Sequence, residues 1–583
     1  MPSVLPHGRP PTHTAVEPGP PENAPWGRRR FLRRLGGVGL ALGAGAVGLR
    51  WATDGAAPAG RGRAQSPDAY AAVDPRDPAT FVRPLALPGA AGGLLGFLDL
   101  TAPLTINAGA GTHEYFDGRQ TPVSLYQAEV GGQRAVNPIL RVRTGDTVTA
   151  RLVNTLTEPT IIHWHGLHVD AANDGHPAQA VPPGGVYDYR FTVRNRSGLY
   201  WYHPHPDMLT GKQAYQGLAG LLLVDDDDEL RLRAALDLEP GVTDIPLVIQ
   251  DRRFTADGRL TYVSTPMDQF MGFTGDTVIV NHTINPALDV DGRLYHFRVL
   301  NGSNARTYRL AFRDGATPLP FRLIGTDGGL LAEPVDVREL FLSPGERADL
   351  LLDLRAAAAG DTVMLSSLSF DPMHNEMGGM GMGMGPGPMG PMGGHQHGPM
   401  MGPASRLDDG AGFHLLKLTV RRRTAYDLAV PARLSEPGGV DTRGGGAPDP
   451  ALDGHDGVVH QRPELGSCPR PVPRTPRRHR DLGVRERHEQ HAPPRAPPRL
   501  PIARDRTARQ PGQIRPLVVD AQGRLASDLG WKDTVLVWPG ETVRAVTRFA
   551  HPFDGAQQYL LHCHVLEHED AGMMVNWRVV DGE

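Results

Sequence analysis

The stretch "LRVRTGDTVTARLVN" (140–154) alternates apolar and polar side chains on both sides of the turn residues Thr144-Gly145-Asp146. Alternation with a period of two is typical of half-buried strands, and Gly-Asp is a common turn pair. A second stretch, "YHFRVLNGSNARTYRLAF" (295–312), repeats the pattern around an Asn-Gly-Ser-Asn turn. Helical patterns are scarce beyond residue 75. The sequence therefore predicts an all-β chain.

A proline-glycine turn followed by an alternating strand occurs three times. The copies are "PPGGVYDYRF" (182–191), "SPGERADLLLDL" (343–354) and "WPGETVRAVTRF" (538–549). They lie about 160 and 195 residues apart, which indicates three related β-units. A chain of 583 residues has room for several domains, each with its own core. We therefore expect three β-sandwich domains in tandem, which we place at 75–228, 235–368 and 410–583.

The composition excludes some classes of function. A net charge of −4 is small for this length, so it gives no reason to expect a nucleic acid or an anionic membrane as partner. Two cysteines cannot form a disulfide framework, so Cys563 is better explained by chemistry than by crosslinking. The 24 histidines are numerous, and many of them lie in short clusters.

The first residues resemble an export signal. In "WGRRRFLRRLGGVGLALGAGAVGLRWA" (26–52) a basic front precedes a Gly/Ala/Leu run that is too short and glycine-rich for a membrane span. The order Arg-Arg-x-Phe-Leu, from Arg28 to Leu32, resembles a twin-arginine signal. We expect residues 1–64 to be a leader, and the mature protein to be periplasmic or extracytoplasmic without a membrane anchor. The alternative is a basic disordered tail.

Two segments interrupt the strand pattern. Residues 371–403 consist almost entirely of Met, Gly, Pro and His, a composition that cannot bury a core. Residues 456–512 are rich in Arg and Pro and show almost no apolar periodicity. The second segment is anomalous, because it falls where the third domain should have its central strands.

Histidine pairs with one residue between their members occur in three apparent strands: "TIIHWHGLHV" (160–169), "GLYWYHPHPDM" (198–208) and "YLLHCHVLEH" (559–568). Residues i and i+2 of a strand face the same side, so each pair presents two imidazoles together. The spacing leaves open whether a pair binds one metal ion or two neighbouring ions. Cys563 faces the opposite side, so one short strand can hold metal on both faces, joined by a covalent path.

The types of ligand select the metal. A thiolate, imidazoles and a thioether at a lone site suit copper used for electron transfer, with Cys563, His568 and Met573 as candidate ligands. Zinc more usually takes paired cysteines or a compact Cys/His set. One histidine pair alone could be a chance surface feature. Three pairs, one of them split by a cysteine, favour a metal site.

The motifs "HWHG", "WYHPH", "GLAGLLLVDD" and "HCHVLEHEDAGMM" resemble those of multicopper oxidases, specifically the bacterial laccase and cuprous oxidase group. The resemblance covers residues from about 75 to 455 and from about 515 to 583. It implies three cupredoxin-like Greek-key β-sandwich domains that bind up to four copper ions. One mononuclear copper takes electrons from a substrate and passes them to a trinuclear cluster, which reduces O2 to water.

Carried over residue by residue, the resemblance assigns Cys563, His568 and Met573 to the mononuclear site. It assigns His163 to the lone copper of the cluster. It assigns to the coupled pair of coppers the other members of the histidine pairs: His165, His203, His205, His562 and His564. Acidic residues that match those relaying protons in the family are Asp174 and Glu569; a solvated surface acid is the alternative for each.

The methionine-rich segment also has a functional interpretation. Thioethers prefer Cu(I), and the segment resembles the substrate-copper loop of cuprous oxidases. A flexible insertion without a ligand is the alternative. The candidate ligands for a substrate Cu(I) ion are Met373, Met377, Met380, Met382, Met384, Met389 and Met392.

One family motif is missing. His-Pro-x-His-x-His-Gly should lie between about 480 and 510 and supply one ligand to the mononuclear copper and two to the cluster; "RHEQHAPPRAPPRLP" (487–501) lacks that spacing. Codons can be chosen for 491–500 that restore the motif when read one base later. We therefore hypothesise compensating one-base shifts near residues 456 and 513. A genuine basic linker is the alternative.

We interpret the chain as an exported, monomeric multicopper oxidase. It would couple the oxidation of Cu(I) or of phenolic and aromatic reductants to the reduction of O2. The missing motif puts activity of the chain as written in doubt. The main alternative is a non-enzymatic protein of the same fold that binds copper or acts as a structural or cell-division factor. A third hypothesis is a copper-sequestering protein that uses chiefly its Met/His segment.

Overall fold

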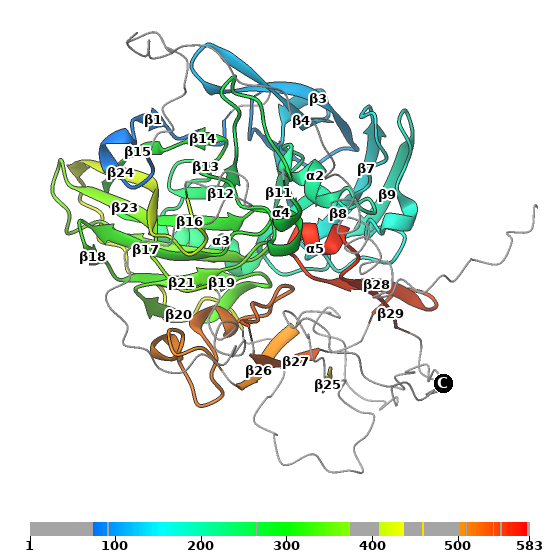
Figure 1. The fold of residues 1–583 in the computed structure, drawn as a ribbon. Helices are drawn as coiled ribbons and strands as arrows, with labels where there is room; N and C mark the ends of the chain where they lie inside the picture. The colour runs from blue at the N-terminus through cyan, green and yellow to red at the C-terminus, as the bar shows by residue number, and fades with distance from the viewer. Residues whose placement is uncertain are drawn as a thin grey trace, which may run out of the picture. The chain divides into compact units, whose positions relative to one another are not determined.

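A computed structural model describes residues 74–89, 93–263, 265–372, 407–436, 458–459, 502–508, 510–539, 541–547 and 551–579. The expected leader (1–64) and the candidate Cu(I) ligands between Met373 and Met392 lie outside these ranges. Within the described ranges the chain consists mostly of strands in several sheets, which confirms the all-β prediction (Figure 1). No helix there is long and apolar enough to cross a membrane.

The first sandwich consists of two five-stranded sheets. One has the order β2 (Phe97–Asp99), β6 (Ile139–Arg143), β11 (Gly220–Asp225), β10 (Gly198–Pro204), β8 (Ile162–His165). The other has the order β5 (Gln133–Val136), β4 (Arg119–Val130), β3 (Leu104–Phe116), β7 (Thr147–Asn154), β9 (Val186–Thr192). The opening stretch supplies β6 and β7, and Gly145 forms their turn with a φ of 99°. These two strands lie in different sheets, so the turn carries the chain across the sandwich.

The second sandwich consists of two seven-stranded sheets. One has the order β1 (Arg83–Pro84), β15 (Pro286–Gly292), β24 (Phe413–Arg423), β23 (Thr362–Ser367), β17 (Tyr308–Asp314), β18 (Thr317–Pro318), with β21 (Leu340–Leu342) also paired to β17. The other has the order β14 (Thr283–Ile284), β13 (Thr277–Val280), β12 (Asp244–Arg252), β16 (Leu294–Asn301), β22 (Arg347–Asp353), β19 (Phe321–Thr326), β20 (Gly329–Val337). The stretch 295–312 again spans two sheets, through β16 and β17.

One strand belongs to a different sheet pair from the one the sequence suggested. We expected residues from 410 onward in the third domain, but β24 pairs parallel with β15 and antiparallel with β23. Its apolar side chains, including Leu416 and Leu418, are fully buried in the core of the second sandwich. The methionine-rich segment is therefore an insertion between two neighbouring strands of one sheet.

The C-terminal part has two smaller sheets. β25 (Val458–Val459), β27 (Thr542–Thr547) and β26 (Ile502–Ala508) form one, and β28 (Gln557–His562) and β29 (Met574–Val579) form a two-stranded sheet. Its short 3-10 helices are η4 (Arg515–Leu517) and η5 (Ala526–Asp528). Between β28 and β29 lies α5 (Leu566–Asp570).

Short helices connect the strands, and two of them, α2 (Thr210–Tyr215) and α4 (Pro266–Met271), lie against α5 of the C-terminal part. A further helix is α3 (Asp227–Leu236), with 3-10 turns η1 (Pro78–Thr80) and η2 (Pro177–Gln179). The carboxylate of Asp570 in α5 accepts hydrogen bonds from the backbone N–H groups of Thr210 and Gly211 at 2.9 and 3.0 Å. α5 therefore contacts α2 of the first sandwich, and it also packs beside α4 (Figure 1).

Candidate metal centre

Three segments distant in sequence bring six histidines together. His163 lies directly opposite His203 in the antiparallel pairing of β8 with β10. The ring centroids of His165 and His564 lie 5.0 Å apart, and those of His205 and His562 also lie 5.0 Å apart. All six histidines predicted from the three pairs therefore converge on one place.

Each of several imidazoles donates one ring N–H and keeps the other nitrogen free. The Nδ1 atoms of His163, His203 and His562 lie 2.5, 2.9 and 3.2 Å from backbone carbonyl oxygens. A carbonyl can only accept, so these rings carry their proton on Nδ1, and the Nε2 lone pair is left for a metal. The Nε2 atom of His203 faces Nδ1 of His165 at 3.3 Å, and that of His562 faces Nε2 of His205 at 3.4 Å.

The donor set fits copper ions in this region. Among the described residues, Nδ1 of His205 and both ring nitrogens of His564 are buried without a hydrogen-bond partner, which is costly unless an ion satisfies them. Burial lowers the pKa of His165 to about 4 and that of His205 to about 3, and it lowers the pKa of His203 and His564 strongly. These four rings are therefore neutral near pH 7, the form that binds a metal.

The two predicted acids adjoin this cluster, and their environments differ. The Asp174 carboxylate lies 3.5 Å from Nδ1 of His163, and burial raises its pKa. The Glu569 carboxylate lies 3.4 Å from Nε2 of His205 and 3.0 Å from Nδ1 of His562. Burial alone would raise the pKa of Glu569, but these two imidazoles outweigh it and hold the pKa well below the usual value. Neither residue is a solvated surface acid, since both are at least nine-tenths buried.

The cysteine and its neighbours form a second donor set. Sγ of Cys563 lies 3.7 Å from Nδ1 of His568, and Nε2 of His568 donates to the carbonyl oxygen of Phe270 at 2.9 Å. The backbone N–H of Cys563 donates to the carbonyl of Met573 at 3.0 Å, and that of Met573 donates to the carbonyl of His568 at 2.9 Å. These bonds bring the three predicted residues into one loop, and the described part of the chain supplies sulfur, one nitrogen and a thioether.

The surroundings of Cys563 affect its chemistry. Burial raises the pKa of its thiol to about 11, so binding a metal there requires loss of a proton. A cavity of about 800 Å³ is lined by Cys563 and Met573 together with His163, His165 and His562, and so adjoins both donor sets.

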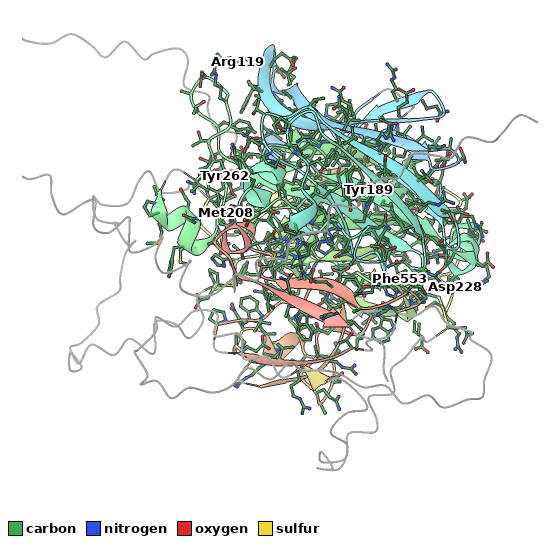
Figure 2. All side chains as sticks on the ribbon, turned by 90° about the vertical axis from the view of Figure 1, so that its right-hand side faces the viewer. Arg119, Tyr189, Met208, Asp228, Tyr262 and Phe553 are labelled. Atoms are coloured by element: carbon green, nitrogen blue, oxygen red, sulfur yellow. The ribbon has the colours of Figure 1, made fainter. Side chains whose placement is uncertain are left out.

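Sequence reasoning missed other buried polar residues around the site. Glu567 accepts hydrogen bonds from the hydroxyl of Tyr262 at 2.8 Å and from Nδ2 of Asn304 at 2.7 Å, which holds α5 against the second sandwich (Tyr262 is labelled in Figure 2). Asp533 contacts His165 and pairs with Arg347. The available signal was "KDT" (532–534), two adjacent charged residues in an otherwise apolar stretch, but Arg347, the partner of Asp533, lies 186 residues earlier.

Comparison with known proteins agrees with this arrangement of ligands. Two family models described as multicopper oxidase match residues 119–229, which contain the first two histidine pairs, and residues 504–583, which contain the third pair with Cys563. The laccase of Bacillus subtilis is 30% identical over 446 residues, which cover 72% of this chain and 80% of the laccase. The chain belongs to the multicopper oxidase family.

Two further multicopper oxidases and one cell division protein are also similar to this chain. The crystal structure of McoA from the hyperthermophile Aquifex aeolicus has a TM-score of 0.63 and 35% identity, and the match covers 85% of this chain and 99% of McoA. The Staphylococcus aureus multicopper oxidase mco is 35% identical over 250 residues, so the chain spans about half of that relative (53%). The cell division protein FtsP of Xenorhabdus nematophila is 38% identical over 219 residues, 38% of this chain and 45% of FtsP.

The cupredoxin-like fold and the family inferred from the four motifs are thus confirmed. Membership of this family implies copper binding and oxidoreductase chemistry.

Proposed function

We propose that this multicopper oxidase couples the one-electron oxidation of Cu(I) or of phenolic and aromatic reductants to the four-electron reduction of O2 to water. The observation that carries the proposal is the position of Cys563 between His562 and His564. Its thiol adjoins His568, while the flanking imidazoles face His205 and His165. Copper bound in the two donor sets would supply electron transfer on one side and oxygen chemistry on the other.

The protein's own residues account for the remaining requirements. His163, His203 and His562 hold their protons on Nδ1 and orient the opposite nitrogen into the cluster. Asp174 has a raised pKa and Glu569 a lowered one, and groups whose pKa values are pushed apart suit the delivery and uptake of protons. Reduction of O2 to two waters takes up four protons, and in this proposal Asp174 and Glu569 relay them.

The experiment that tests the function combines colour, copper content and oxygen uptake. Purified chain is loaded with copper, and its blue absorption and its O2 consumption with Cu(I) or with a phenol are measured. A blue, copper-loaded protein that consumes O2 in proportion to oxidised substrate supports the oxidase. Copper binding without O2 consumption favours a copper-binding protein instead.

The second candidate function is a non-enzymatic role, including one in cell division. The absence of His-Pro-x-His-x-His-Gly from the written sequence and the similarity to FtsP favour it. The oxidase proposal therefore includes the hypothesis that residues 456–512 are read from a shifted frame. The second family match begins at residue 504, so family-like sequence resumes about nine residues before the downstream boundary that this hypothesis sets near residue 513.

The location and the reducing substrate are part of the proposal. The arginine-rich front of residues 26–52 supports export by the twin-arginine route to the periplasm or another extracytoplasmic compartment. A fusion of residues 1–64 to a reporter should be exported, and replacing Arg28 and Arg29 by lysine should prevent it. The thioethers between 373 and 401 support Cu(I) as substrate.

A further inference from the structure

His165 differs from most of its neighbours in the nitrogen that carries its proton. Its Nε2 atom lies 3.0 Å from Oδ1 of Asp533, whereas its Nδ1 atom faces Nε2 of His203 at 3.3 Å. An ionised carboxylate only accepts hydrogen bonds, so a proton on Nε2 satisfies this contact and leaves the Nδ1 lone pair directed at the cluster. His163, His203 and His562 use the reverse arrangement, with the proton on Nδ1.

Asp533 is fixed as a carboxylate by Arg347, a buried residue of β22. The guanidinium donates from Nη1 to Oδ1 of Asp533 at 2.7 Å and from Nη2 to Oδ2 at 2.5 Å. Its other donors go to the carbonyl oxygens of Leu199 at 3.1 Å, Gly345 at 2.9 Å and Asp327 at 3.1 Å. All five N–H groups of Arg347 are therefore used, and the bidentate pair holds Asp533 in a single orientation.

The backbone next to His165 is shaped around this ion pair. Gly166 has a φ of 86°, and a Cβ atom there would lie 2.4 Å from Oδ2 of Asp533 and 2.7 Å from Nη2 of Arg347. A side chain at position 166 would thus displace the pair. The "HG" of "HWHG" places the carboxylate and the guanidinium directly against the chain that carries the ligand.

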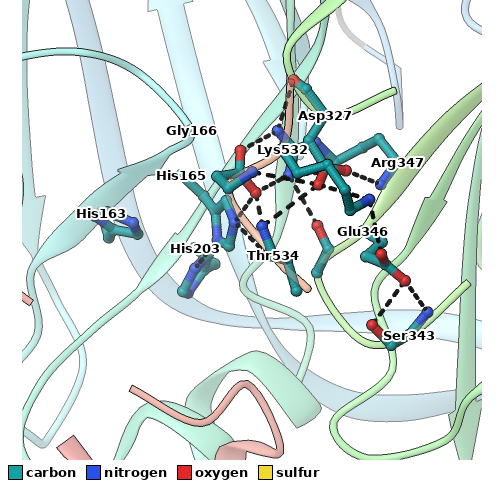
Figure 3. A network of polar contacts seen from close by, with 12 residues as sticks. His163, His165, Gly166, His203, Asp327, Ser343, Glu346, Arg347, Lys532 and Thr534 are labelled. Atoms are coloured by element: carbon teal, nitrogen blue, oxygen red, sulfur yellow. Dashed lines mark hydrogen bonds and ion pairs between the residues drawn. The ribbon is translucent and has the colours of Figure 1, made fainter. Parts of the chain in front are cut away.

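A wider buried network supports the same pair, as Figure 3 shows. Oδ1 of Asp327 accepts the backbone N–H of Arg347 at 2.7 Å, and Oδ2 lies 3.2 Å from Nζ of Lys532. Lys532 also pairs with Glu346 at 2.8 Å. This ion-paired set contains three carboxylates and two cations, so one negative charge remains uncompensated. Lys532 is shared by Asp327 and Glu346, so the excess charge lies with these two residues, whereas Arg347 is committed to Asp533, whose Oδ1 faces His165.

We propose that Asp533, held by Arg347, is the positioning residue that keeps the proton of His165 on Nε2 and its Nδ1 lone pair available to copper. The inference rests on the proposed copper chemistry, but it concerns a contact between the second sandwich, the 531–534 segment and β8. Copper uptake by His165 and His203 thus depends on an ion pair that binds no metal itself.

The first test needs no copper. Nitrogen-15 NMR of histidine-labelled, metal-free chain reports which ring nitrogen carries the proton, and the signal of His165 is the one that disappears in His165→Gln. The expected result is a neutral ring with its proton on Nε2. A proton on Nδ1 of His165 would overturn the proposal.

The second test measures copper affinity by anaerobic competition between the full chain and a Cu(I) chelator. In Asp533→Asn the amide NH2 must face Arg347, His165 or both, so we expect affinity to fall about 10–100-fold, as for other residues that orient metal ligands. The matched control is Glu346→Gln, which removes a buried charge from the same network without contacting His165. It should change affinity less than about threefold.

The outcomes distinguish a positioning role of Asp533 from a purely structural one. They also distinguish failure of this proposal from failure of the proposed oxidase function. Equal losses in both variants, or unchanged affinity in Asp533→Asn, would show that the pair is only structural. If Asp533→Asn does not fold, the nitrogen-15 measurement on the unaltered chain decides. If the unaltered chain takes up no copper, the proposed oxidase function fails for the chain as written, and the proton position on His165 still tests the proposal.

Discussion

The two sandwiches between residues 83 and 423 differ from the C-terminal region between 502 and 579 in what their buried side chains contact. Each sandwich closes around a core of its own: Trp164 and Tyr202 lie in the first, Phe297 and Leu350 in the second. In the described part of the C-terminal region, Ile514, Leu525 and Trp538 pack against Phe341 of β21, a strand of the second sandwich. The segment between β26 and β27 thus packs against another domain.

The two donor sets show the same difference. The histidines of β8 and β10 belong to the first sandwich, where neighbouring strands fix their backbone. Cys563 and His568 lie in the short connection, which includes α5, between two strands that pair only with each other among the described residues. The cluster ligands of the first sandwich are therefore positioned by a complete fold, whereas the cysteine site, together with His562 and His564 of the cluster, depends on contacts from α2 and α4. This contrast can be tested in five ways.

Restoring the reading frame between residues 456 and 512 should give the third domain its central strands and so remove the difference between the two regions. The restored chain regains three histidine ligands, so copper content and oxidase activity should rise more than about 100-fold over the chain as written, since even loss of a ligand's hydrogen-bond partner costs about 10–100-fold. Copper per chain, blue absorption and O2 uptake are the measurements. A resequenced, uninterrupted gene that yields a blue and active enzyme would contradict the hypothesis.

Cys563→Ser should abolish blue absorption and turnover in a copper-loaded, active preparation, because no other described residue of that site can supply a thiolate. Absorption spectra and O2 uptake are compared with those of the unaltered protein. Cys468→Ser is the matched control for the chain as written, and it should leave copper binding unchanged. Retained colour or turnover in Cys563→Ser would sink the assignment of the mononuclear site.

Truncating an apolar side chain should cost more stability in the second sandwich than in the C-terminal strands. Leu350 is fully buried in β22, and Leu350→Ala should lower the free energy of unfolding by about 2–5 kcal/mol. Leu560 in β28 is only half-buried, so Leu560→Ala should cost less than about 1 kcal/mol. Urea unfolding followed by circular dichroism measures both. Equal costs would mean that the C-terminal strands have a core as complete as that of the sandwich.

The second sandwich should lose stability as the pH rises from 6.5 through 9. Burial and Arg298 lower the pKa of His296, but Asp244 at 3.2 Å and Asp349 at 3.7 Å outweigh them and raise it to about 9. A pKa raised on folding gives stability that is complete below the unfolded value and lost above the folded one. The loss should be about 3 kcal/mol.

Unfolding midpoints at several pH values test the contribution of His296. The slope of stability against pH between 6.5 and 9 should be flatter in His296→Gln than in the unaltered chain. Identical slopes in the two proteins would show that His296 does not hold its proton in the folded state.

Deleting residues 373–401 should have the smallest effect, and only on one substrate. If the thioethers of this segment bind substrate Cu(I), its oxidation should slow about tenfold, equivalent to ~1.4 kcal/mol, while oxidation of a bulky phenol stays within about twofold. Stability should be nearly unchanged, because the deletion lies between β23 and β24 and leaves both strands intact. Equal losses on the two substrates would show that the segment has no role in selecting Cu(I).

The sequence predicted those parts of the molecule that depend on local pattern. Strand alternation around Gly145 located β6 and β7, and the i, i+2 spacing of His163 and His165 indicated that both imidazoles face one side. The partner of a strand depends on contacts across the whole fold, which is why β24 was assigned to the third domain. Asp533 could not be identified as a partner of His165, because the two residues are separated by 368 positions.

The insertion between β23 and β24 has a consequence for how this chain tolerates change in length. A backbone hydrogen bond of 2.9 Å from Phe370 to Gly410 closes its base, so the ends stay together whatever lies between them. Closing a loop between fixed ends costs only about 0.6 kcal/mol more each time its length doubles. Residues can thus be gained, lost or replaced in this insertion at little cost to the stability of the sandwich, so its length and composition can vary independently of the fold.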